Sequence, residues 1–63
     1  MKATDFRCYI VSIDDDKYDY RVTVQRLTDG ISKSDRVSGS WIIAEHRANG
    51  LARELGMDET VSL

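Results

Sequence analysis

Residues 6–28 read FRCYIVSIDDDKYDYRVTVQRLT, and this stretch decides the fold. Residues 6–13 are rich in aromatic and β-branched side chains, which favour strands. Residues 14–17 are all polar and have the length of a hairpin loop. From Tyr18 to Gln25, apolar and polar residues then alternate with the period of a half-buried strand. The stretch therefore predicts an antiparallel hairpin.

A third strand is predicted over residues 31–37, because Asp29-Gly30 is a pair typical of tight turns. If Ile13 faces Tyr18 and Thr28 faces Ile31, the apolar residues of all three strands reach one face. That face is expected to hold Tyr9, Val11, Ile13, Tyr18, Tyr20, Val22, Val24, Ile31 and Val37. The other face is expected to hold Phe6, Cys8, Ile10, Ser12, Asp19, Arg21, Thr23, Gln25, Leu27, Ser32, Ser34 and Arg36.

Residues 41–55 predict a helix, with Ser40 as its N-cap and Gly56 as its stop. At about 100° per residue, one side of this helix is apolar. The predicted stripe consists of Trp41, Ala44, Ala48, Leu51, Ala52 and Leu55. We therefore predict an α+β fold, a three-stranded antiparallel β-meander with one C-terminal helix packed on one face (βββα). Residues 1–63 are expected to form a single small domain.

The composition, 41% hydrophobic and 32% charged residues, is typical of a folded domain. The single cysteine, Cys8, has no partner for an internal disulfide, which favours a reducing compartment. No apolar run is long enough for a membrane span or signal peptide, and we expect a cytoplasmic protein. The formal net charge of −2 means that nucleic-acid binding would need a local basic patch.

The residues that enzymes need are not arranged in any recognisable set. The sequence has no Ser-His-Asp set, no cluster of cysteines and histidines at metal-ligand spacing and no glycine-rich phosphate loop. Cys8 and His46 are expected on opposite sides of the sheet, too far apart to act as nucleophile and base. We therefore predict a protein that is not an enzyme and that uses no cofactor and no metal.

Residues 51–62, LARELGMDETVS, resemble the second helix and turn of bacterial helix-turn-helix regulators. Ala52 and Leu55 match packing positions of that motif, and Gly56 matches its turn. The resemblance implies a DNA-reading helix, but the chain stops at Leu63, before such a helix would be complete. We therefore predict a helix that ends at Gly56, with Met57 folding back and a short tail.

Strand one is apolar on both of its predicted faces, so something is expected to cover it. The candidates are a second copy of the chain, another protein, or Val61 and Leu63 of the tail. Ile42 and Ile43 lie outside the helix stripe and form either a second contact surface or a buried first turn. The acidic loop residues would contact a basic partner or simply form a solvated turn.

We predict a small protein-binding module, similar in size and composition to phage and mobile-element accessory proteins, that occludes a functional surface on a host protein. The partner would be such a host protein or, in a homodimer, a second copy. The candidate protein-binding residues are Phe6, Ile10, Asp14, Asp15, Asp16, Arg21, Arg36, Ile42 and Ile43.

The alternative is a DNA-binding domain that reads duplex DNA with the open face of its sheet. A three-stranded sheet backed by one helix has the general shape of the DNA-binding arm domains of tyrosine recombinases. Arginine and glutamine recognise guanine and adenine edges in the major groove. Here the hydrogen-bonding side chains would be Arg21, Thr23, Gln25, Ser34 and Arg36.

Overall fold

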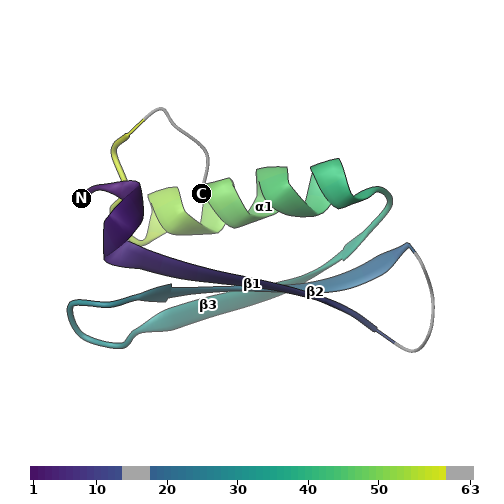
Figure 1. Cartoon of the computed structure of the whole chain (residues 1–63), viewed down its shortest axis with the longest axis horizontal. Helices are drawn as coiled ribbons and strands as arrows, with labels where there is room; N and C mark the ends of the chain where they lie inside the picture. The colour runs from purple at the N-terminus through teal and green to yellow at the C-terminus, as the bar shows by residue number, and fades with distance from the viewer. Residues whose placement is uncertain (14–17, 60–63) are drawn as a thin grey trace.

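The computed structural model describes residues 1–13 and 18–59, and it has the predicted order of elements (Figure 1). Three antiparallel strands form one open sheet in the order β1-β2-β3, and a helix packs against it. The elements are a 3-10 turn η1 (Ala3–Asp5), strands β1 (Phe6–Ser12), β2 (Asp19–Arg26) and β3 (Ser32–Ser38), and helix α1 (Trp41–Glu54). The predicted βββα fold is therefore confirmed.

The turn between β2 and β3 is longer than the two-residue turn predicted at Asp29-Gly30. The backbone N–H of Arg26 donates to the carbonyl oxygen of Ile31 at 2.8 Å, so residues 27–30 form the loop. The Arg26 guanidinium donates to both carboxylate oxygens of Asp29, at 3.0 and 2.6 Å. This bidentate pair stabilises the wider loop, and Gly30 supplies its positive φ of 77°.

The wider loop shifts the pairing of β2 with β3 by two residues. Val37 lies opposite Tyr20, whereas the sequence predicts Val22 as its partner. Since side chains alternate along a strand with a period of two, an even shift leaves them on their predicted faces. Val37 is accordingly buried on the helix side.

The pairing of β1 with β2 differs from the prediction by one residue, and this correction changes the faces of β1. Ile10 lies opposite Val22, where the sequence predicts Tyr9. An odd shift turns every side chain of the strand to the other face. Phe6 and Ile10 therefore face the helix, while Tyr9 and Val11 face away and are 44% and 59% exposed.

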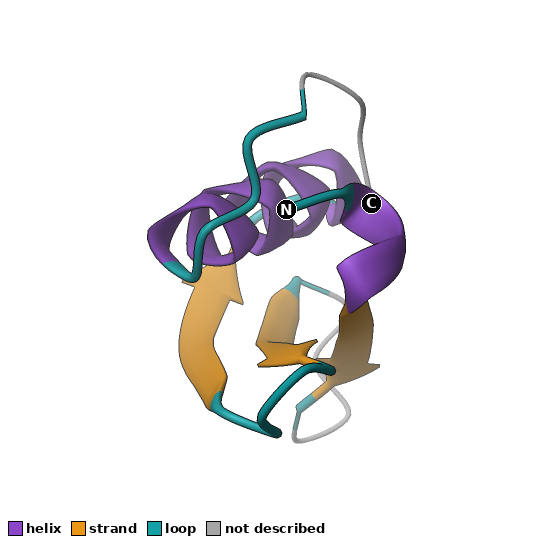
Figure 2. Ribbon diagram, turned by 90° about the vertical axis from the view of Figure 1, so that its left-hand side faces the viewer, coloured by secondary structure: helices purple, strands orange, loops and turns teal. Residues whose placement is uncertain are grey.

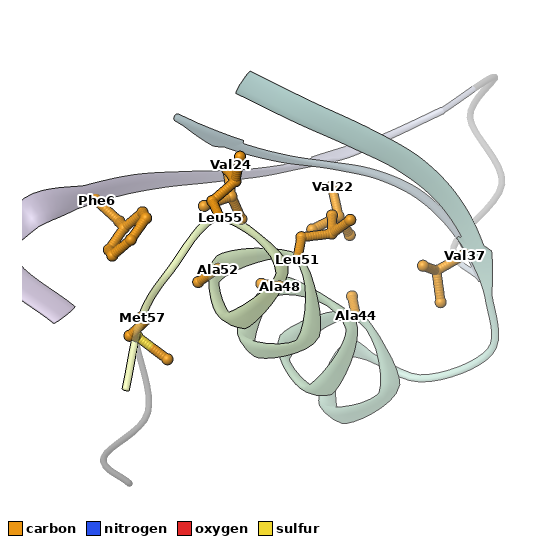
Figure 3. Close-up of a cluster of buried hydrophobic side chains, with 10 residues drawn as sticks. All are labelled: Phe6, Val22, Val24, Val37, Ala44, Ala48, Leu51, Ala52, Leu55 and Met57. Carbon is orange, nitrogen blue, oxygen red and sulfur yellow. The ribbon is translucent and has the colours of Figure 1, made fainter. Parts of the chain in front are cut away.

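The reason for this difference lies in the composition of β1, which is apolar at both alternations and so fits either register. The observed register buries Phe6, the largest purely apolar side chain of the strand, to 7% exposure. Figure 3 places Phe6 at the end of the core where Leu55 and Met57 also lie. Ile10 packs against the same core. Neither residue therefore forms the exposed surface that the sequence predicts.

The core lies between the sheet and one side of α1. Val22 and Val24 of β2 have no exposed surface, and the alanines of the helix stripe pack over them (Figure 3). Small side chains let the helix approach the sheet closely. The buried residues are Phe6, Val22, Val24, Val37, Ala44, Ala48, Leu51, Ala52, Leu55 and Met57. The predicted helix stripe is thus buried except at Trp41.

Several aromatic and branched residues predicted for the core are exposed instead. Trp41 is 49% exposed and contacts the Tyr20 ring edge to face, with centroids 5.7 Å apart. Because Trp41 is the first residue of α1, the sheet covers only part of its ring. The other exposed residues of this group are Tyr9, Val11, Tyr18 and Ile31.

Both predicted ends of α1 are confirmed. The Ser40 side chain accepts a hydrogen bond from the backbone N–H of Ile43, as an N-cap does. The helix continues through Gly50 and ends before Gly56, whose φ is 110°. The N–H of Met57 then donates to the carbonyl of Ala52 at 2.9 Å, which folds the chain back. No second helix follows α1 within the described residues, which end at position 59.

We predict that Phe6→Ala lowers the free energy of unfolding by about 3 kcal/mol, because it leaves a cavity under the helix. Tyr9→Ala is the matched control, since the same kind of truncation at an exposed position is expected to change stability by less than about 1 kcal/mol. Urea denaturation of the purified variants measures both values. A larger loss for Tyr9→Ala would show that β1 uses the other register.

Candidate functional site

The candidate site is the face of the sheet that α1 leaves uncovered, which we call the open face. Figures 1 and 2 show α1 on one side of the sheet and no described helix or strand on the other. Strand alternation assigns eleven side chains of the three strands to this face. They are Arg7, Tyr9, Val11, Asp19, Arg21, Thr23, Gln25, Ser32, Ser34, Arg36 and Ser38.

Strand pairing arranges nine of them in three rows across the sheet, and Asp19 and Ser38 form a further pair at the border beside the third row. The first row contains Arg7, Gln25 and Ser32. The central row contains Tyr9, Thr23 and Ser34. The third row contains Val11, Arg21 and Arg36. Successive rows lie about 7 Å apart along the strands, and the outer strands lie about 10 Å apart. The open face is thus a compact patch with guanidinium groups in its outer rows and hydroxyl groups at its centre.

Hydrogen bonds connect neighbouring side chains of the open face. The hydroxyl groups of Thr23 and Ser34 are 2.9 Å apart in the central row. Arg7 Nη1 donates to the hydroxyl of Tyr9 at 3.4 Å, which links the first row to the central one. Gln25 donates from its amide to the carbonyl of Gly30 at 3.4 Å. These bonds fix the side chains while leaving other polar atoms of the exposed face available to a ligand.

The third row brings two like charges together, since Arg21 lies directly opposite Arg36. Like charges opposite one another in an antiparallel pair destabilise the sheet. Asp19 compensates one of them, because its carboxylate accepts hydrogen bonds from Arg36 Nη2, at 3.4 Å, and from the Ser38 hydroxyl. No ion pair joins Arg21 to an acidic side chain in the described parts of the chain. This row is therefore the part of the face best suited to an anion.

Three acidic side chains on the helix side and at the β2–β3 turn, Asp29, Asp35 and Glu54, pair with basic residues there. Arg47 Nε donates to Asp35 at 2.7 Å, and Lys33 lies 3.5 Å from Glu54. Hydrogen bonding to Arg47 lowers the pKa of Asp35, and the bond from Arg26 likewise lowers the pKa of Asp29. Described charges on the open face and its border are three arginines and Asp19, a net charge of about +2. The charge of −2 for the whole sequence conceals this separation.

The predicted binding residues do not form one surface. Arg21 and Arg36 lie together on the open face, as predicted. Ile42 and Ile43 are exposed on the first turn of α1, 64% and 48% respectively. Phe6 and Ile10 lie on the core side, as described above. The predicted acidic loop residues Asp14, Asp15 and Asp16 lie outside the described residues.

Sequence reasoning misses the three β1 members of the open face, namely Arg7, Tyr9 and Val11. Their signal is present, because they occupy alternate positions in a strand that begins with Phe6. The sequence does not show which alternation faces the helix, since Ile10 on the other alternation is as apolar as Val11. Only the packing of β1 under α1 resolves this choice.

A second concave surface, which we call the β1 groove, lies between β1 and α1. It has a volume of about 670 Å³. The lining residues are Ala3, Thr4, Phe6, Arg7, Cys8, Ile10, Trp41 and Glu45. The groove is largely apolar, and it opens along β1, an edge strand of the sheet.

Cys8 lies in this groove on the helix side, which corrects its predicted place on the open face. Burial raises the pKa of its thiol, and the nearby carboxylate of Glu45 raises it further. Both effects disfavour the thiolate, which is the nucleophilic form of cysteine. His46 does not line the groove; it lines a second small hollow with Ile42, Glu45 and Asn49.

Within residues 1–13 and 18–59, no three His, Cys, Asp or Glu side chains gather as metal ligands would. The same part of the chain contains no helix that combines the length and apolar character needed to cross a bilayer. No known protein family, curated protein or solved structure matches this chain.

We predict that Arg21→Gln raises the free energy of unfolding by about 0.5 kcal/mol at low ionic strength, because it relieves repulsion with Arg36. Thermal denaturation at low and high salt measures the effect, which is expected to shrink as salt screens the charges. Arg47→Gln is the matched control and is expected to lower stability, since it breaks the ion pairs with Asp35 and Glu54. A lower free energy of unfolding for Arg21→Gln would contradict this prediction, because it would show that the Arg21 guanidinium stabilises the folded protein.

Proposed function

We propose that this protein binds duplex DNA through the open face of its sheet. The observation that carries the proposal is the third row, where Arg21 and Arg36 stand opposite each other on an uncovered face. This arrangement opposes folding, so a bound anion offers a reason for it. DNA presents phosphate groups at short, regular intervals and would neutralise both side chains.

The dimensions of the open face support DNA as the anion. The three strands span about 10 Å, and the major groove of B-DNA is about 12 Å wide. Sheets and β-ribbons are known to enter DNA grooves in other proteins. The deep and narrow major groove of duplex RNA would not admit the sheet. We therefore propose that the strands of the open face lie in the major groove.

The side chains of the three rows would have different roles. Arg21 and Arg36 would contact phosphate oxygens or guanine edges, and Asp19 would hold the Arg36 guanidinium in place. Gln25 would reach a base edge, for which adenine is the usual partner. The hydroxyl groups of the central row would donate to phosphate oxygens. The proposed activity is thus binding without catalysis, in the cytoplasm that the single Cys8 favours.

Affinity in this proposal depends strongly on salt. With about three phosphate contacts from Arg7, Arg21 and Arg36, the logarithm of the binding constant falls with a slope of about −2.7 against the logarithm of salt concentration. Binding would therefore weaken by about 40-fold between 50 and 200 mM salt.

We predict that Arg21→Ala and Arg36→Ala each weaken binding to a fluorescein-labelled 20-base-pair duplex by about five- to tenfold in fluorescence anisotropy at 50 mM salt. Each change is also expected to reduce the salt slope by about one. Arg53→Ala is the matched control, because Arg53 is exposed on α1, away from the open face. No binding by the unchanged protein at 50 mM salt, or an equal loss in Arg53→Ala, would contradict the proposal.

A second function, occlusion of a surface on another protein, is favoured by the exposed first turn of α1. Ile42 is 64% exposed and makes this turn apolar beside Trp41. Ile43 has a partly structural role, because its side chain lies over Gly39, where a Cβ atom would come within 2.7 Å of it. Ile42 is therefore the residue of this pair that is free to anchor a partner.

If the protein works by occlusion, Ile42→Asp is expected to lose a specific partner in pull-downs from the native host, without loss of stability. Arg21→Ala is expected to retain the same partner, because it changes the opposite side of the molecule. Mass spectrometry of the retained proteins compares the two variants. If Arg21→Ala loses the partner and Ile42→Asp retains it, the first turn of α1 is not the surface that binds the partner.

A further inference from the structure

The two edges of the sheet differ in their chemistry. β3 carries charged residues along its length, including Lys33, Asp35 and Arg36, and such charges protect an edge strand from pairing with other chains. β1 has Arg7 as its one charged residue and is apolar on both faces. A strand that is apolar on both faces is typical of the interior of a sheet. β1 therefore has the composition of an inner strand but lies at an edge.

Within the described residues, β1 presents backbone hydrogen-bonding groups along this edge that no other strand pairs with. At its two ends, Ile13 N–H donates to Asp19 O at 3.0 Å and Leu27 N–H donates to Asp5 O at 2.9 Å. These bonds show that the odd-numbered positions of β1 exchange hydrogen bonds with β2. The even-numbered positions therefore direct their N–H and C=O groups outward. They are Phe6, Cys8, Ile10 and Ser12, of which Phe6 already donates its N–H to the carbonyl oxygen of Ala3.

We propose that β1 pairs with β1 of a second copy of this chain, antiparallel and about a two-fold axis at Tyr9. In this register Cys8 lies opposite the partner's Ile10, and Phe6 lies opposite the partner's Ser12. Cys8 and the partner's Ile10 exchange both of their backbone hydrogen bonds, and the Phe6 carbonyl accepts from the N–H of the partner's Ser12. The two sheets thereby become one continuous sheet.

The proposed register keeps like charges apart. Arg7 lies opposite the partner's Val11, so the one charged residue of the strand meets an apolar side chain and not its own copy. The two Tyr9 rings meet at the axis on the open-face side, and aromatic cross-strand pairs stabilise sheets. Pairing about a two-fold axis places Arg7 opposite Val11 and Tyr9 opposite Tyr9 with the same strand on both sides. The edge of β1 therefore fits a second copy of the chain.

The β1 groove is covered in the same arrangement. Trp41 borders the groove near Ser12, because it contacts Tyr20, the residue paired with Ser12. Ala3 and Thr4 border its other end, beside Phe6. Antiparallel pairing places the Trp41 end of one groove beside the Ala3 end of the other. Trp41 of each copy thus lies beside the small residues Ala3 and Thr4 of its partner. The apolar side chains that line both grooves are then buried from water.

Dimerisation does not depend on DNA binding, but it would extend the open face. Both open faces lie on the same side of the joined sheet, so two sets of Arg7, Arg21 and Arg36 flank the axis. A two-fold axis of this kind matches DNA sites with two symmetric halves.

Analytical ultracentrifugation of the full chain without DNA, from 10 μM to 1 mM, tests the proposal. We expect a mass that rises with concentration towards twice the 7.2 kDa of the chain. Val11→Lys is expected to raise the dissociation constant about tenfold, since it places an ammonium group opposite the partner's Arg7 at two symmetric positions. Val11→Glu, the matched control at the same exposed position, is expected to keep or strengthen the dimer. A monomer at 1 mM, or equal effects of both variants, would overturn the proposal.

The native Cys8 provides a second measurement that needs no substitution. In the proposed register the Cα atoms of the two Cys8 residues are roughly 9 Å apart on the groove side. A short bismaleimide is expected to produce a covalent dimer at pH 8, and prior alkylation with a monofunctional maleimide is expected to prevent it. Complete alkylation of Cys8 with only monomer after bismaleimide treatment would show that β1 does not lie at a two-fold interface.

Discussion

The packing of Phe6 beneath α1 is the contact on which the other features of this structure depend. It fixes the pairing of β1 with β2, with Ile10 opposite Val22. Since a strand places alternate side chains on opposite faces, this one choice determines which side chains are available to a ligand. Arg7, Tyr9 and Val11 become part of the open face, and Phe6, Cys8 and Ile10 line the β1 groove. Both proposed interaction surfaces follow from the position of one aromatic ring.

The distribution of charge gives the open face a character that the whole sequence does not show. Arg26 pairs with Asp29 at the turn, and Arg47 pairs with Asp35 between α1 and β3. These pairs neutralise acidic groups outside the open face and hold the helix and the turn in place. The open face keeps its arginines, of which only Arg36 has a described acidic partner. A small acidic protein thus carries a basic surface on the side of the sheet that α1 does not cover.

The sequence predicts correctly those elements whose apolar residues recur with a single period, either that of a strand or that of a helix. The alternation in β2 places Arg21 away from the core correctly, and the helical period identifies the alanine stripe. β1 is different, because its apolar residues occupy both alternations and no local rule decides between Phe6 and Tyr9. The loop of residues 27–30 is wider than its Asp29-Gly30 pair suggests, because the contacts of Asp29 with Arg26 stabilise it. Exposure of Trp41 follows from its place at the first position of α1, which a helical stripe alone does not reveal.

The most direct test of the account is a measurement of NOEs between α-protons across β1 and β2 in the isotope-labelled protein. Such protons are close only at the pairs that do not exchange backbone hydrogen bonds. The structure predicts strong NOEs between Ile10 and Val22 and between Cys8 and Val24. Strong NOEs from Val22 to Tyr9 in their place would contradict the account. They would show a register in which Arg7 and Tyr9 face the helix and are not part of the open face.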